Sequence, residues 1–97
     1  MMLYVLVADD KPDGLADRLA IRPEHLKHLE SLGDKLILAG PFTDQNGDSN
    51  GSIVVIEAAN QAEAEALFKQ DPFIVKGLFT AYQIRPWKLT INNTTKI

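Results

Sequence analysis

Residues 35–58, KLILAGPFTDQNGDSNGSIVVIEA, contain two apolar segments separated by a cluster of turn-forming residues. The segments 35–42 and 52–58 are rich in Leu, Ile and Val, which favour β-strands. Residues 44–51 between them are mostly Asp, Asn, Gly and Ser, a composition typical of a turn. The centre of the chain is therefore predicted to be a hairpin of two antiparallel strands.

Two further apolar segments, near the two ends of the chain, are predicted to be strands. Residues 2–8, MLYVLVA, form a near-continuous apolar run, and residues 79–87, FTAYQIRPW, form the fourth strand. Because proline has no backbone N–H, Pro86 suits only an edge strand or the end of a strand.

A first helix is predicted between the first strand and the hairpin, over residues 23–32. Proline is favoured at the first position of a helix, so Pro23 is a suitable start, and Gly33 is a suitable residue to follow the end. Residues 12–20, PDGLADRLA, are predicted to add a separate short turn of helix before it.

A second helix is predicted after the hairpin, from Asn60 as its cap to about Gln70, followed by a short helical turn over 71–77 with Asp71 as its cap. The resulting order is β-α-β-β-α-β. This order favours an α+β, ferredoxin-like fold, in which a four-stranded antiparallel sheet carries two helices on one face. A swapped strand order or a small open sandwich is the main alternative.

The composition of the chain is that of one globular domain and excludes several classes of protein. The 97 residues are 45% hydrophobic and 24% charged, with a net charge of −3 and no cysteine. Scattered Lys and Arg side chains argue against a nucleic-acid partner. The sequence predicts neither a disulfide framework nor a membrane span, and we expect a cytoplasmic protein without a secretion signal.

The strands are apolar on both faces, although helices are expected on only one. Leu3, Val5 and Val7 alternate with Tyr4 and Leu6, all of them apolar. Leaving one such face in water would forgo on the order of 10 kcal/mol, comparable with the stability of a whole domain. We therefore expect a homodimer that packs sheet face to sheet face. The alternative is a monomer whose C-terminal tail or N-terminal insert folds over the sheet.

His25 lies on the apolar side of the first predicted helix, with Leu29 and Leu32, one turn from the predicted start. The topology brings Asp71 and the Gly51-Ser52 pair to the same end of the domain. A carboxylate that binds one ring nitrogen of a histidine orients the ring, so that the other nitrogen can exchange a proton with a substrate. The structural alternative is a packed histidine and an aspartate that only caps a helix.

Other polar residues are weaker candidates. Arg18 and Arg22, one turn apart, suit an anion at the helix start, but arginines on the solvated surface are commoner. His28 is expected at the surface. The two histidines and one distant aspartate do not form a recognisable zinc pattern, so no metal site is predicted.

The segments LYVLVADDKPDGLADRLAIRPEHLKHL, AGPF, GSIVVIEA, DPFIVKGLF and IRPWK, in this order, resemble the YciI-like (YCII-related) family. The resemblance implies one YciI-like domain over residues 1–88, a C-terminal tail over 89–97, and a dimeric α/β barrel. It also implies an active site built on His25 and Asp71. The residues expected to bind the substrate are Arg22, Ser52, Gly40, Pro41 and Phe73.

Two functions remain open from the sequence. The first is an enzyme without metal or organic cofactor, in which His25 is the acid and base on a small polar or aromatic molecule. Elimination or hydrolysis is the chemistry that the resemblance implies. The second is a non-catalytic dimer of the same fold that binds a small molecule or has a structural role. No sequence feature demands a third function, cofactor-free oxygenation.

Overall fold

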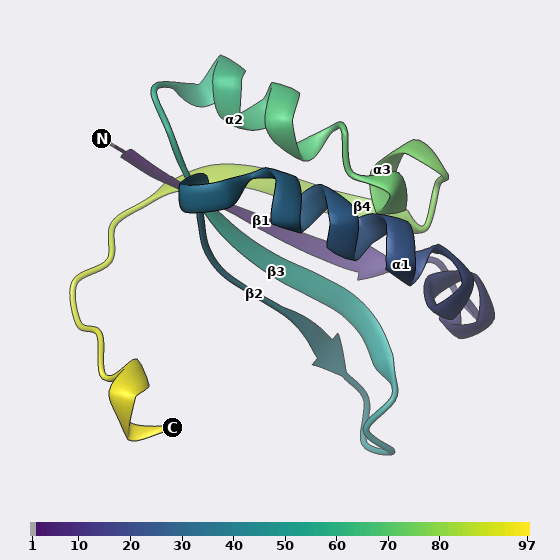
Figure 1. Ribbon diagram of the computed structural model, residues 1–97. Helices are drawn as coiled ribbons and strands as arrows, with labels where there is room; N and C mark the ends of the chain where they lie inside the picture. Colours follow the sequence, from purple (N-terminus) through teal and green to yellow (C-terminus); the bar gives the residue numbers. More distant parts are fainter. Residues whose placement is uncertain (1) are drawn as a thin grey trace.

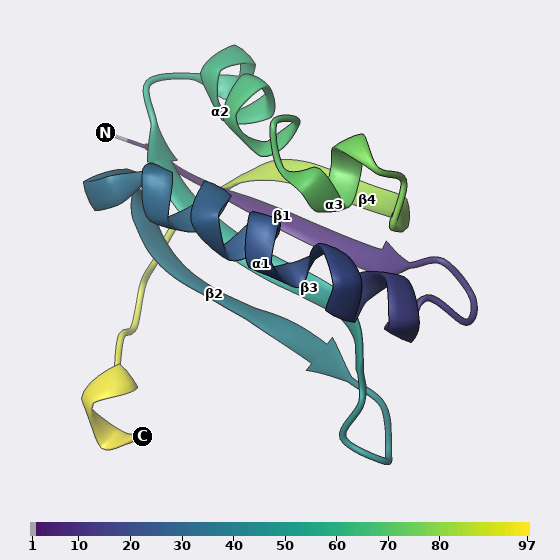
Figure 2. The ribbon, with the colours of Figure 1, turned by 45° about the vertical axis from the view of Figure 1, so that its right-hand side comes forward.

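The structure, a computed structural model that describes residues 2–97, has a four-stranded antiparallel sheet with its three α-helices on one face (Figure 1, Figure 2). The strands are β1 (Met2–Asp10), β2 (Leu36–Thr43), β3 (Ser49–Ala58) and β4 (Phe79–Trp87). The α-helices are α1 (Leu15–Ser31), α2 (Gln61–Phe68) and α3 (Pro72–Val75), and short 3₁₀ turns lie at Gly33–Lys35 and Thr94–Lys96. The strand order β2-β3-β1-β4 confirms the predicted ferredoxin-like α+β fold.

The predicted local signals at α2, α3 and β4 are present in the structure. The side chain of Asn60 caps α2 by accepting a hydrogen bond from the backbone N–H of Glu63, at 2.9 Å. Asp71 caps α3 in the same way, through the N–H of Phe73. β4 is an edge strand, as Pro86 requires. Within residues 2–97, no helix combines the length and the apolar character needed to cross a membrane.

The first helix differs from its prediction. α1 is one continuous helix of 17 residues with Pro23 inside it. The prediction that the helix starts at Pro23, with residues 12–20 as a separate turn, is therefore wrong. Proline removes one hydrogen bond from a helix interior. The carbonyl that loses its partner belongs to Leu19, and both Leu19 and Pro23 are exposed, so water can solvate it.

The first half of α1 is held to the sheet by Arg18, which is only 5% exposed. Its Nε and Nη2 donate to the two carboxylate oxygens of Asp10, at the end of β1, at 2.7 and 3.0 Å. Nη2 also donates to the carbonyl of Gly51 at 2.7 Å and to the hydroxyl of Ser52 at 2.8 Å. These charge-assisted bonds join α1 to β1 and β3, and they stabilise a helix that begins well before its proline.

The core lies between the helices and one face of the sheet. β1 contributes Tyr4, Leu6 and Ala8, and β3 contributes Val54, Ile56 and Ala58. The helices and the segments beside them contribute Leu29, Leu32, Ala64, Phe68, Phe73, Leu78 and Phe79. The core therefore uses alternate residues of the two central strands, which leaves the other half of each strand on the opposite face.

The opposite face of the sheet, which we call the open face, is also largely apolar. Val55 of β3 pairs with Val5 of β1 and with Leu38 of β2, so these three side chains share this face. Val55 is 1% exposed, whereas Val7, Leu38 and Phe42 are each 39% exposed. The open face is therefore only partly shielded in a single chain.

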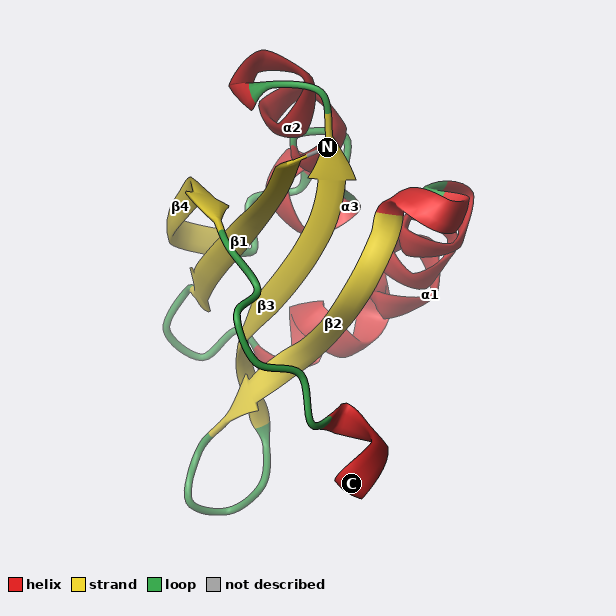
Figure 3. Cartoon of the chain, turned by 90° about the vertical axis from the view of Figure 1, so that its left-hand side faces the viewer, coloured by secondary structure: helices red, strands yellow, loops and turns green. Residues whose placement is uncertain are grey.

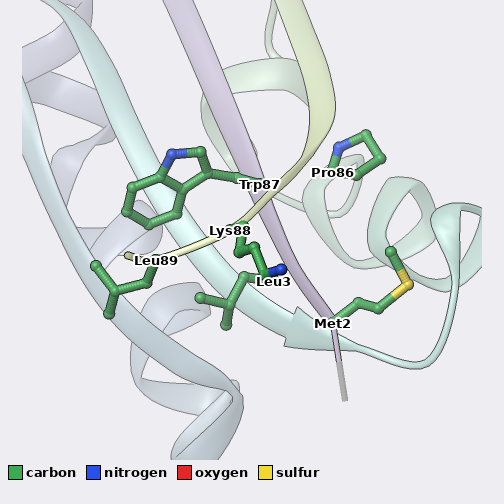
Figure 4. Close-up of a pocket in the computed structure, with 6 residues that line it drawn as sticks. All are labelled: Met2, Leu3, Pro86, Trp87, Lys88 and Leu89. Atoms are coloured by element: carbon green, nitrogen blue, oxygen red, sulfur yellow. The ribbon is translucent and has the colours of Figure 1, made fainter. Parts of the chain in front are cut away.

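The C-terminal tail, residues 89–97, passes in front of the open face (Figure 3). Where the tail leaves β4, Trp87 and Leu89 line a pocket of about 480 Å³ together with Leu3 (Figure 4). Farther along, Ile91 is 76% exposed. The tail thus begins against the sheet and then offers its own apolar side chains to solvent. The N-terminal insert, residues 10–21, does not cover the open face, because residues 15–20 are part of α1 on the other face of the sheet (Figure 1).

Replacing Asp10 with alanine is expected to lower the free energy of unfolding by about 3–5 kcal/mol, because the Arg18 guanidinium would stay buried without its partner. Urea unfolding followed by circular dichroism measures the change. Asp17→Ala is the matched control, since Asp17 pairs with Lys11 at the surface, where such pairs contribute about 0–1 kcal/mol. An Asp10→Ala protein as stable as this control would show that the buried pair does not hold α1.

Candidate functional site

His25 and Asp71 lie in contact although they are 46 positions apart in the sequence. Nδ1 of His25 is 2.8 Å from both carboxylate oxygens of Asp71, and the two residues are 7% and 2% exposed. Asp71 is also the N-cap of α3, where Oδ1 accepts the N–H of Phe73 at 2.9 Å. One carboxylate therefore both starts α3 and orients the imidazole. His25 lies in the second half of α1, not one turn from its start as expected.

The ring of Phe73 contacts two side chains of α1. His25 stacks on it, with the ring centroids 4.0 Å apart and 16° between the planes. The guanidinium carbon of Arg18 is 4.6 Å from the Phe73 centroid. Arg18 precedes His25 by two turns, about 10 Å along the helix axis. Both groups therefore pack against the Phe73 ring.

A pocket of about 250 Å³ lies between α1 and the strands β2 and β3. It is lined by Arg18, Leu19, Arg22, His25, Leu26, Leu29, Ala39, Gly40, Pro41, Ser49, Ser52 and Val54. Five of the seven residues expected in the site are in this lining. The other two, Asp71 and Phe73, contact His25 instead, and the fully buried ring of Phe73 packs against His25, Arg18 and Phe79.

The orientation of His25 leaves its second nitrogen at the pocket. When the ring is neutral, Nδ1 donates its proton to the Asp71 carboxylate, so Nε2 carries a lone pair. None of the hydrogen bonds described for His25 uses Nε2. Every buried side-chain nitrogen or oxygen in residues 2–97 has a partner, so Nε2 is accessible rather than buried. The pocket therefore contains a proton acceptor that is fixed in direction by the carboxylate behind it.

The buried pair of Arg18 and Asp10 was not predicted from the sequence. Arg18 was expected at the solvated surface or at an exposed anion site, whereas it is buried against both central strands. The available signal was the position of Asp10 at the end of the first strand, beside the Gly51-Ser52 pair. Because α1 starts at Leu15, it includes Arg18, which lies two turns before His25 on the same face of the helix. Within residues 2–97, no group of three or more His, Cys, Asp or Glu side chains is arranged to hold a metal ion.

The chain is similar to characterised and uncharacterised proteins over nearly its whole length. The family model described as the YCII-related domain matches residues 2–88. Protein YciI of Escherichia coli O6:H1 is 37% identical over 95 residues, which cover 90% of this chain and 97% of that protein. An uncharacterized protein of Haemophilus influenzae is 34% identical with the same coverage.

One similar solved structure contains a bound ligand. It is the 5-chloro-2-hydroxyhydroquinone dehydrochlorinase from Burkholderia phenoliruptrix, in complex with 2,5-dihydroxybenzoquinone. The two chains are 32% identical and superpose with a TM-score of 0.82, over 90% of this chain and 94% of the other. The similarity thus extends to both sequence and fold.

Nitrogen NMR of the imidazoles tests the orientation of His25. At a pH where both rings are neutral, ¹⁵N shifts are expected to show His25 with its proton on Nδ1, because the Asp71 carboxylate binds that proton. His28 is the internal control, because its ring is partly exposed and an unconstrained imidazole prefers its proton on Nε2. A spectrum that places the His25 proton on Nε2 would contradict the proposed orientation.

Proposed function

Because the chain belongs to the YCII-related family, we propose that its pocket is an enzyme active site in which His25 is the general acid and base. The proposed substrate is a small hydroxylated ring. The contact between Nδ1 of His25 and Asp71, which leaves Nε2 at the pocket, is the observation that carries this proposal. The name of the similar dehydrochlorinase, which describes loss of chloride and a proton from a hydroxylated ring, supports the choice of reaction.

The proposed reaction is an elimination. Nε2 of His25 removes a proton from an O–H or C–H bond of the substrate. The reacting form of the ring is a keto tautomer, in which the carbon that bears the leaving group has taken up a proton and is tetrahedral. The electron pair of the broken bond forms a new double bond conjugated with this carbon, and the leaving group departs with the electron pair of its own bond to carbon. The net loss is one proton and one leaving anion. Asp71 stabilises the imidazolium that forms, and it keeps the ring in place throughout.

The size and the walls of the pocket suit one ring. An engineered cavity of about 150 Å³ in another protein binds benzene, so about 250 Å³ accommodates a single ring with several substituents. Leu26, Leu29 and Val54 provide apolar contact for the ring. Ser52 and Arg22 provide polar contact for its substituents.

Turnover of 5-chloro-2-hydroxyhydroquinone and related halogenated hydroquinones, measured as halide release, tests the reaction. His25→Ala is expected to lower kcat/KM by about 10²–10⁴, the usual contribution of a positioned general acid or base. Asp71→Asn should also lower kcat while the fold is kept, because asparagine caps a helix as well as aspartate does.

Equal turnover in the wild type and in both variants would refute the His25–Asp71 mechanism. Tight binding of the same compounds without any halide release would favour the non-catalytic alternative. Far-UV circular dichroism of each variant checks that the overall secondary structure is kept.

We also propose that two copies of the chain pair through their open faces. Val7, Leu38 and Phe42 lie on this face and remain partly exposed in the single chain. Burial of several such side chains in each copy would contribute on the order of 10 kcal/mol before the cost of association. A twofold pair of identical faces is the arrangement that covers both at once.

Leu38→Lys is expected to shift the protein from dimer to monomer in sedimentation-velocity experiments, because a charged side chain would be buried in the interface. Val75→Lys is the control, since Val75 lies on α3, on the other side of the sheet, and is 67% exposed. A wild type that sediments as a monomer at all concentrations would refute the dimer.

A further inference from the structure

We propose that the Arg18 end of the pocket is an oxyanion site, formed by Nη1 of Arg18 and the hydroxyl of Ser52. The pocket would then select a small aromatic anion, a ring that carries an ionised oxygen. The inference rests on the proposed function only in that it concerns the ligand of the same pocket. Of the two arginines that the sequence offered as anion-binding candidates, it assigns the main role to the buried Arg18.

The hydrogen bonds of Arg18 leave one of its nitrogens available. Nε and Nη2 bind Asp10, and Nη2 also binds Gly51 and Ser52, but none of these four bonds uses Nη1. Since no buried side-chain nitrogen in residues 2–97 lacks a partner, Nη1 is accessible. Arg18 is part of the pocket lining, so its two remaining N–H groups have the pocket as their accessible space.

The hydroxyl of Ser52 is a second donor beside the first. Its oxygen accepts a hydrogen bond from Nη2 of Arg18 at 2.8 Å, so its own proton is left for another acceptor. Ser52 is 3% exposed and lines the pocket. Nη2, which binds this oxygen, and Nη1 are attached to the same guanidinium carbon, so we place the two donors side by side. An oxygen atom of a ligand can accept from both.

The charges around the pocket favour an anion over a cation. The charged and titratable residues of the lining are Arg18, Arg22 and His25, without a carboxylate. The nearest carboxylates are already engaged, because Asp10 binds Arg18 and Asp71 binds His25. Arg22 is exposed and adds a positive charge at the pocket surface. A ligand oxygen with a negative charge therefore meets donors and positive charge only.

The two ends of the pocket are chemically different, and this difference sets the orientation of the ligand. The Arg18 end offers donors, whereas His25 offers the lone pair of Nε2. Their Cα atoms are about 10 Å apart along α1, and both side chains contact Phe73. A ring with an ionised oxygen on one side and a hydroxyl on the other satisfies both ends. Since Asp10 holds the guanidinium in place, the donors need little reorganisation when the anion binds.

The probe for this site is 4-nitrophenol, whose neutral and ionised forms have different absorption spectra. Titration at a pH just below its ionisation in water is expected to raise the band of the bound 4-nitrophenolate. Nitrobenzene, which has the same ring without the oxygen, is expected to bind at least about ten-fold more weakly, because it lacks a charge-assisted hydrogen bond. Bound probe that absorbs as the neutral phenol, equal binding of nitrobenzene, or binding of neither probe would overturn the proposal.

Variants locate the oxygen within the pocket. Ser52→Ala is expected to weaken binding of the phenolate about ten-fold, the usual effect of one hydrogen bond to a charged group. The paired change Arg18→Gln with Asp10→Asn removes both buried charges together, so it leaves neither unpaired, and it should abolish the preference for the anion. Ser31→Ala, an exposed serine of α1 outside the pocket, is the control.

The assignment would be overturned if Ser52→Ala and the paired variant both preferred the anion as strongly as the wild type does. So would loss of this preference in Arg22→Gln alone, because the anion would then be held by Arg22. His25→Ala separates this inference from the proposed function, since it should lose turnover and still bind the phenolate. A protein that binds the phenolate but releases no halide refutes the elimination alone.

Discussion

The structure depends on a buried ion pair between Arg18 of α1 and Asp10 of β1. Two charges removed from water are costly unless both are satisfied, and here the guanidinium binds a carboxylate, a carbonyl and a hydroxyl at one end of the sheet. A shift of α1 by one residue would break all of these bonds. The pair therefore fixes the rotation and the position of α1, and with them the direction in which His25 points, two turns later.

The same constraint joins α3 to the site. Phe73, two residues after the cap residue of α3, packs its ring against both Arg18 and His25, while the cap residue itself, Asp71, binds Nδ1 of the imidazole. Packing, helix capping and orientation of the histidine are thus properties of one contiguous group of side chains. Asp71 can cap α3 and bind His25 at the same time, because Oδ1 accepts the N–H of Phe73 while both carboxylate oxygens lie 2.8 Å from Nδ1 of His25.

The sequence predicted the parts of this arrangement that depend on local patterns and on strand order. The four strands, the caps at Asn60 and Asp71, and the shared position of His25 and Asp71 follow from periodicity and topology. The start of α1 did not, because the local preference of Pro23 for a first helical position is outweighed by contacts of Arg18 with residues 33 and 34 positions away. The contact of the Phe73 ring with Arg18 was missed for the same reason, because the predicted first helix began only at Pro23.

The C-terminal tail competes with a second copy of the chain for the open face (Figure 3). A segment that leaves β4 at the rim of this face samples it at a local concentration on the order of millimolar, far above that of a free second chain at ordinary dilution. Association of two copies therefore requires either that each tail is displaced or that the tails are exchanged between them. In the second case the tail with Ile91, which is exposed in the single chain, would pack on the neighbouring copy. Dissociation would then be slow, because both tails must be released.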